Sequence, residues 1–126
     1  MLSLPSSVRI FVARGATDMR KSFDTLASLV CDAIDEDPQS GHLFVFLNRR
    51  KDLVKILWCD RSGYCLLAKR LENGQFRIYD KATNAAGHFE MALSDLTLLL
   101  EGIDLRGAKR RSSHDEITAI MCRAPA

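Results

Sequence analysis

The chain has 126 residues, of which 47% are hydrophobic and 27% are charged, as expected of one soluble globular domain. Seven glycines and three prolines are too few for a collagen-like or low-complexity chain. No apolar run approaches the roughly 18–20 residues that cross a bilayer, and the first residues lack the pattern of a secretory signal. These features predict a cytoplasmic protein with no membrane segment.

The distribution of charge is more informative than its total. Eighteen basic and sixteen acidic residues give a net charge of +2, which is weak support for nucleic-acid binding. Four of the six residues 106–111 are basic and none is acidic, which indicates either a phosphate-binding arm or a solvated tail. We therefore expect one domain over residues 1–105, followed at 106–126 by a basic arm and a short helix or disordered tail.

The first elements are a strand and a helix. Residues 8–13 predict a strand, and Arg14-Gly15 ends it. A helix should follow, because apolar residues recur at spacings of three or four: Met19, Phe23, Leu26, Val30 and Ile34. Thr17 or Asp18 should cap its start, and Pro38 should lie beyond its end. Met19 and Phe23 are expected in the core.

An antiparallel meander should come next. Residues 43–47, 53–59 and 65–71 predict strands, and Asn73-Gly74 predicts a type I′ hairpin that returns through residues 75–79. A loop at 80–89, a short helix capped by Ser94 and a last helix after Ser113 complete the chain. The predicted class is α+β, with an antiparallel meander of about four to five strands packed against one main helix.

Two-residue turns would fix the register of this meander. They place Trp58 opposite Leu67 on an apolar face, where Trp58 is a core residue. The other face would carry Lys55, Arg70 and Arg77 in a row across three strands. Like charges directly opposite one another are unfavourable, so the row indicates a phosphate track or side chains that splay apart beside acidic neighbours.

Catalytic and metal-binding patterns are not evident in the sequence. The four cysteines form no C-x-x-C pair, the three histidines are far apart, and there is no Gly-rich phosphate loop or nucleophile elbow. The aspartates that a nuclease core would need have structural interpretations, as a cap or as turn and strand-end residues. We expect a protein that is not an enzyme and that uses no metal or cofactor.

Several ordered motifs resemble one protein family. Residues 18–23 read Asp-Met-Arg-Lys-Ser-Phe, and matching segments follow at 41–51, 55–57, 69–72 and 99–104. The chain resembles, from Met1 to about Arg111, the TnpB (Orf2-like) accessory proteins of the insertion-sequence-66 family of bacterial transposable elements. The resemblance implies a non-catalytic role in transposition, with a separate transposase and a sister accessory protein as partners.

Clusters of basic residues lead to the functional hypothesis. We expect an accessory protein that binds element DNA through phosphates, and the candidate contacts are Arg20, Lys21, Arg49, Arg50, Lys51, Lys55, Arg70, Arg77, Lys109, Arg110 and Arg111. Arg20 and Lys21 should lie in the first helical turn, where a cation needs an acidic or phosphate partner. The alternative is a protein-interaction module that binds the transposase without contacting DNA. The sequence leaves the oligomeric state and the DNA target open.

Overall fold

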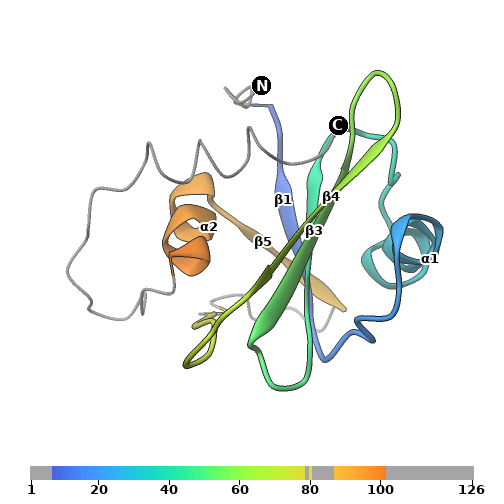
Figure 1. The fold of residues 1–126 in the computed structure, drawn as a ribbon. Coiled ribbons are helices and arrows are strands. Elements are labelled where there is room, and N and C mark those ends of the chain that lie inside the picture. The colour runs from blue at the N-terminus through green and yellow to red at the C-terminus, as the bar shows by residue number, and fades with distance from the viewer. Residues whose placement is uncertain (1–6, 79, 81–86, 102–126) are drawn as a thin grey trace.

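A five-stranded mixed sheet organises the protein in the computed structural model, which describes residues 7–78, 80 and 87–101 (Figure 1). Its strands are β1 (Ile10–Ala13), β2 (Leu43–Leu47), β3 (Leu53–Cys59), β4 (Tyr64–Arg70) and β5 (His88–Met91). They lie in the order β4-β3-β2-β1-β5. The meander covers β2 to β4, whereas β1 pairs with β2 in parallel and with β5 in antiparallel. The α+β class is confirmed, and the sheet is mixed.

A helix crosses from β1 to β2, as parallel neighbours require. It comprises α1 (Phe23–Leu29) and a π-helical turn, η1 (Val30–Ile34). The predicted cap at Thr17 or Asp18 is wrong, because Ser22 is the N-cap and its backbone N–H donates to Thr25 Oγ1 at 2.8 Å. Asp18 instead holds a turn before the helix, where its carboxylate accepts the N–H of Arg20.

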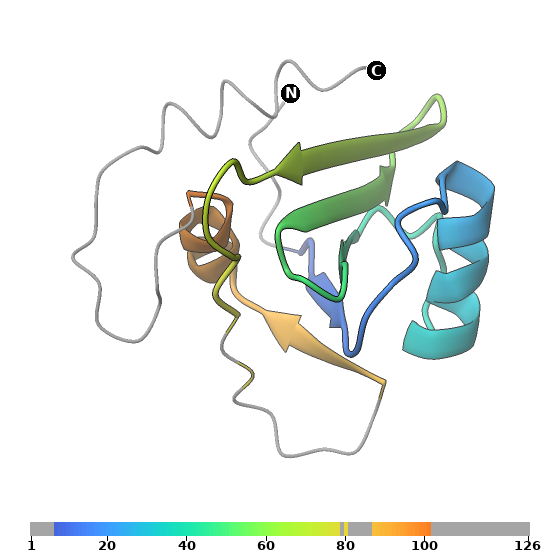
Figure 2. The same cartoon turned by 60° about the horizontal axis from the view of Figure 1, so that its bottom comes forward.

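Side chains alternate between the two faces of the sheet, and a helix covers each face (Figure 2). Leu26, Val30 and Ile34 of α1 and η1 pack on one face with Phe44 and Phe46 of β2. Phe23, the first residue of α1, was expected in the same core but is 44% exposed.

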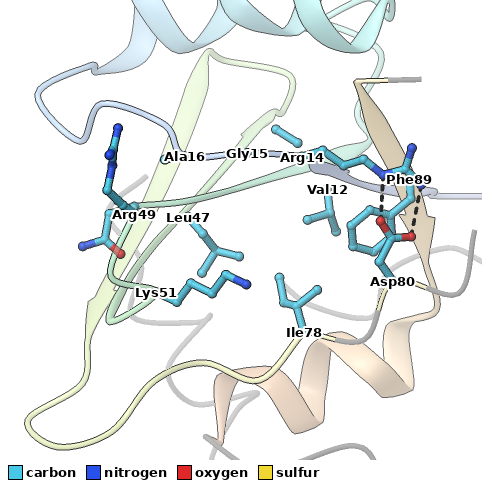
Figure 3. A pocket seen from close by; sticks show the side chains of 12 residues that line it. Val12, Arg14, Gly15, Ala16, Leu47, Arg49, Lys51, Ile78, Asp80 and Phe89 are labelled. Atoms are coloured by element: carbon cyan, nitrogen blue, oxygen red, sulfur yellow. Dashed lines mark hydrogen bonds and ion pairs between the residues drawn. The ribbon is translucent and has the colours of Figure 1, made fainter. Parts of the chain in front are cut away.

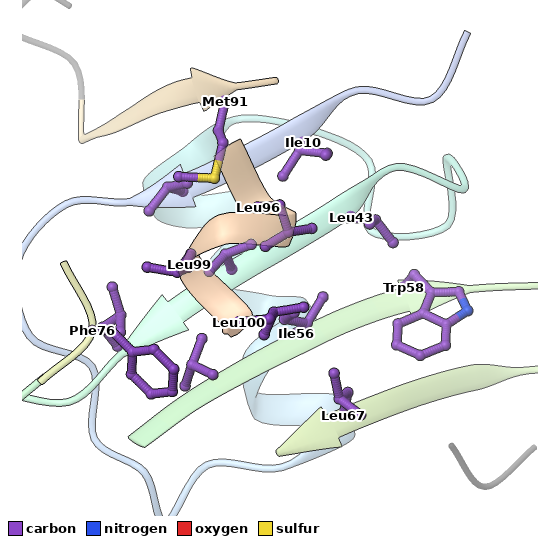
Figure 4. Close-up of a cluster of buried hydrophobic side chains, with 14 of the residues drawn as sticks. Ile10, Leu43, Ile56, Trp58, Leu67, Phe76, Met91, Leu96, Leu99 and Leu100 are labelled. Atoms are coloured by element: carbon purple, nitrogen blue, oxygen red, sulfur yellow. The ribbon is translucent and has the colours of Figure 1, made fainter. Parts of the chain in front are cut away.

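The second face carries α2 (Leu93–Leu100), which buries Leu96, Leu99 and Leu100 against the strands (Figure 4). Trp58 and Phe76 lie in the same cluster, so Trp58 is a core residue as expected. Burying one such side chain stabilises the fold by about 1.5–3 kcal/mol. The N-cap of α2 is Ala92 and not Ser94. No helix among the described residues is long and apolar enough to cross a membrane.

The register of β3 and β4 differs from the expected one by two residues. Trp58 pairs with Cys65 and Lys55 pairs with Ala68, because the turn takes up Asp60 and Arg61 as well. The Asp60 carboxylate accepts the N–H groups of Ser62 and Gly63 and so closes a wider turn. A shift of two residues keeps every side chain on its face, so the apolar face persists. The predicted pairing of Lys55 with Arg70 is wrong.

Residues 75–78 do not return as a strand. Phe76 donates its N–H to the Lys51 carbonyl at 2.6 Å, and the Gln75 amide donates to the Arg50 carbonyl. The segment therefore crosses the β2–β3 turn, and Arg77 does not extend a basic row over the sheet. β5 lies where a loop was predicted. Tyr79, the residues after Glu101 and the predicted C-terminal helix lie outside the described residues.

Candidate functional site

Basic side chains gather at one end of the sheet. This end holds the carboxyl termini of β1, β2 and β4, and the connecting residues 14–22, 48–52, 71–78 and 80 (bottom of Figure 1). The N–H of Thr17 donates to the carbonyl of Leu47 at 2.8 Å, which joins the first connection to the end of β2. We call this region the basic end, after Arg14, Arg20, Lys21, Arg49, Arg50, Lys51, Arg70 and Arg77.

The opposite end of the sheet is acidic. Asp35, Glu36 and Asp37 follow η1, and Asp60 lies in the β3–β4 turn. Arg61 shares that turn, and Arg9, just before β1, is bound to the Glu90 carboxylate. A difference of this kind between two ends of a small domain produces a field that orients the molecule toward polyanions.

The turn between β2 and β3 forms the tip of the basic end. The Asn48 side chain accepts the N–H groups of Asp52 and Leu53 at 3.1 Å and donates to the Asp52 carboxylate at 2.6 Å. This fixed turn places Arg49 and Arg50 at an exposed corner. Lys51 follows with φ of 58°, a left-handed conformation that residues other than glycine rarely adopt.

Two arginines of the basic end have carboxylate partners. Arg14 contacts Asp80 through two hydrogen bonds of 2.7 and 3.1 Å. The Arg20 guanidinium donates hydrogen bonds to the Asp18 carboxylate. These hydrogen bonds hold the pKa of the Asp18 carboxyl well below its usual range. Arg20 and Lys21 precede the helix, so the expectation that they lie in its first turn is wrong.

Lys55 binds backbone carbonyls. Its ammonium donates to the carbonyls of Met19 and Lys21, both at 2.8 Å, and so ties β3 to the segment before α1. Lys69 on β4 donates in the same way to the carbonyl of Leu100 at the end of α2. Both lysines are half-buried and hold elements of the fold together.

The other cations of the basic end have no carboxylate partner within hydrogen-bond distance among the described residues. They are Lys21, Arg49, Arg50, Lys51, Arg70 and Arg77. Arg50 and Arg70 both lie near Asp52, whose pKa is lowered first by the hydrogen bond from Asn48 and further by these two charges. The structure thus brings Arg50 of the tip and Arg70 of β4 to one surface. Lys109, Arg110 and Arg111 lie outside the described residues.

A cavity of about 370 Å³ opens beside the tip (Figure 3). Its walls come from the carboxyl ends of β1 and β2, from β5, and from Ile78 and Asp80. Arg14, which sequence analysis did not select, lies at this cavity with its guanidinium 5.6 Å from the centre of the Phe89 ring. The residues that line the cavity come together only because β1 pairs with β2 and β5. Their positions in the sequence gave no signal of this pairing.

Away from the basic end, the titratable groups of the described residues lack the grouping that a metal site needs. No group of three or more histidine, cysteine or acidic side chains among the described residues could hold a metal ion. Cys59 and Cys65 are free thiols, and burial raises the pKa of Cys65 to about 11. What the described surface offers chemically is an array of cations with an adjoining apolar cavity, which suits the binding of a phosphate polymer.

Comparison with known proteins identifies the family. A family model described as "IS66 Orf2 like protein" matches residues 8–110. The chain belongs to the IS66 Orf2-like family. This membership gives it a transposition-associated accessory role, and the family description names no catalytic activity.

Two relatives of this Orf2-like protein come from Sinorhizobium fredii (strain NBRC 101917 / NGR234). "Uncharacterized protein y4hO" is 40% identical over 106 residues, which cover 84% of this chain and 90% of the relative. "Uncharacterized protein y4jC" is 34% identical over 111 residues, which cover 88% of this chain and 92% of the relative. No solved structure matches the chain.

Proposed function

We propose that this Orf2-like protein is a non-catalytic accessory factor that binds element DNA through its basic end. The observation that carries the proposal is the set of six cations at that end that have no carboxylate partner among the described residues. The acidic opposite end supports it, because a polar molecule presents only one end to a polyanion.

The contacts in the structure separate the candidate DNA-binding residues into phosphate contacts and residues with a structural role. Six cations are assigned to phosphates in this proposal, because no carboxylate among the described residues forms an ion pair with them: Lys21, Arg49, Arg50, Lys51, Arg70 and Arg77. Lys55 is assigned a structural role, since two carbonyls already accept from its ammonium. Arg20 reaches a phosphate only by leaving Asp18. Lys109, Arg110 and Arg111 are proposed as further phosphate contacts on sequence grounds alone.

Phosphate contacts of this kind position a protein on DNA without reading its sequence. Arginine is well suited to them, because its planar guanidinium donates two parallel hydrogen bonds to phosphate oxygens. Affinity should therefore vary little among duplexes of different sequence and should fall as salt rises.

A salt titration tests the proposal. Log affinity for a blunt duplex should fall linearly with log salt, and Arg50→Gln should reduce the slope by about 0.9, the loss of one phosphate contact. Arg61→Gln is the matched control, because Arg61 is also an exposed arginine in a hairpin turn but lies at the acidic end. If Arg50→Gln and the wild type had equal salt slopes, Arg50 at the tip would not contact the DNA phosphates.

The second candidate function keeps the accessory role but assigns it to protein contacts. If the wild-type protein has no affinity for duplex DNA even at low salt, binding to the transposase or to the sister accessory protein replaces the DNA proposal. A pull-down from cells that carry the complete element, with and without nuclease, separates the two functions. A partner that is lost with nuclease is held through DNA, and a partner that is retained is held directly.

A further inference from the structure

The cavity of the basic end lies where α/β folds commonly bind ligands. β1 and β2 are parallel neighbours, and the cavity opens at the carboxyl ends of both strands. Its volume of about 370 Å³ falls within the range of cavities that hold small molecules. It also adjoins Arg49 and Lys51, so one ligand can contact the cavity and the proposed phosphate surface together.

The walls of the cavity are mainly apolar. Val12, Leu47, Ile78 and Phe89 line it, and the small residues Gly15 and Ala16 keep its mouth open (Figure 3). The guanidinium of Arg14 lies over the Phe89 ring and binds the Asp80 carboxylate. The negative charge of Asp80 is therefore balanced within the cavity wall.

Lys51 gives the cavity its polarity. Its side chain points into the cavity, while the side chain of Arg49 extends away from the Lys51 ammonium (Figure 3). The ammonium of Lys51 has no carboxylate partner among the described residues. Its backbone holds a left-handed conformation with φ of 58°, a type of local strain that clusters at ligand sites.

We propose that this cavity binds one unpaired nucleotide of the bound DNA. The base lies against the apolar wall formed by Val12, Ile78 and Phe89, and its phosphate contacts Lys51. The nucleotide must be unpaired, because a base within the duplex is stacked and paired and has to leave the helix to enter a pocket. The inference rests on the proposed function, and it adds that the protein prefers DNA ends or distorted sites over intact duplex.

The test compares two DNA probes that differ by one nucleotide. One is a blunt duplex, and the other is the same duplex with a single unpaired 2-aminopurine at one end. The wild-type protein should bind the second probe at least about fivefold more tightly, the lower end of what base stacking contributes. Entry of the base into the cavity should also change its fluorescence.

Two variants locate the effect. Ala16→Phe fills the cavity without removing a charge, so it should abolish the preference and the fluorescence change while it leaves the salt slope on blunt duplex unchanged. Ser28→Phe is its control, because it adds the same ring to an exposed position of α1. If Ala16→Phe fails to fold, Lys51→Asn serves instead, since asparagine tolerates the left-handed conformation and lacks the charge. It should reduce the preference for the unpaired probe.

The outcomes separate this inference from the proposed function. Equal affinity of the wild-type protein for both probes, without a fluorescence change, overturns the inference and leaves DNA binding intact. No affinity for either probe overturns both. If deoxyadenosine monophosphate alone shifts the amide resonances of Ala16 and Phe89 and neither DNA probe binds, the cavity binds a free nucleotide and the inference is wrong in its DNA form.

Discussion

At the scale of single residues, Lys55 shows that a basic side chain in a strand can have partners within the fold. Lys55 was a candidate for DNA binding on the strength of its place in a predicted row. Its ammonium instead lies between two backbone carbonyls that precede α1, those of Met19 and Lys21. Removing one partner from such a contact costs more free energy than the contact contributes, because the other groups remain desolvated.

Lys55→Met should therefore act on stability. It removes the donor from the carbonyls of Met19 and Lys21, and we expect the free energy of unfolding to fall by about 1–3 kcal/mol. Urea denaturation measures the change. Arg77→Gln, at an exposed position, is the control and should stay within about 0.5 kcal/mol of the wild type. A stable Lys55→Met protein with a reduced DNA salt slope would return Lys55 to the DNA surface.

Cys65 makes a prediction about pH. Burial, with the nearby Asp60 carboxylate, raises the pKa of the Cys65 thiol from its ordinary value of 9.0 to about 11. The neutral thiol is thus favoured in the folded state, and its contribution to stability is complete below pH 9 and is lost as pH rises toward 11. Urea denaturation between these values should show a steeper loss of stability for the wild type than for Cys65→Val. Parallel pH profiles for the two proteins would contradict this assignment.

At the scale of elements, the sequence predicts best those segments whose pattern is long and internally consistent. β2 and β3 have the predicted bounds, because each is an apolar run set between turn residues. Residues 75–79 were assigned from the local Asn-Gly signal alone, but Phe76 is drawn into the core while its N–H binds the Lys51 carbonyl. A long-range contact of this kind is not encoded in neighbouring residues. β5 was missed for the same reason, since its four residues are a strand only beside β1.

The backbone at the C-terminal end of the α1–η1 helix is strained, and a substitution can test this. Asp35 follows η1 with φ of 58° and is an acid at the negative end of a helix, and both features are unfavourable. Asp35→Gly should stabilise the protein by about 0.5–1 kcal/mol, because glycine adopts this conformation without steric cost. Thermal denaturation provides the measurement. Asp35→Ala is the control, since it removes the charge and keeps the Cβ. If alanine stabilised the protein as much as glycine, charge and not backbone conformation would be the cause.

At the scale of the whole molecule, the site depends on chain topology. The individual clusters at Arg49–Arg50–Lys51 and at Arg70 could be read from the sequence, but their position on one end of the sheet follows from the order β4-β3-β2-β1-β5. The cavity is even harder to predict from the sequence, because its walls combine β1, β2 and β5, which are separated in the chain. The parallel pairing of β1 and β2 decides both features, and a predicted antiparallel meander does not contain it.

The separation of basic and acidic residues at opposite ends of the molecule also bears on how the proposed accessory factor would be oriented on DNA. A protein whose cations lie at one end can approach DNA with that end and keep its acidic end, at residues 35–37 and 60, away from the phosphates. In the proposed function, the acidic end and the helices do not contact the DNA. This arrangement is compatible with a factor that stands between an element's DNA and its transposase.

Mapping the DNA contact by nuclear magnetic resonance tests the central claim most directly. A short blunt duplex would be titrated at low salt into the ¹⁵N-labelled full-length protein. The account predicts amide shifts at Arg49, Arg50, Lys51, Arg70 and Arg77, and unchanged resonances at residues 35–37 and 60–63. Shifts concentrated at the acidic end, or no shifts among the described residues, would contradict the assignment of DNA binding to the basic end.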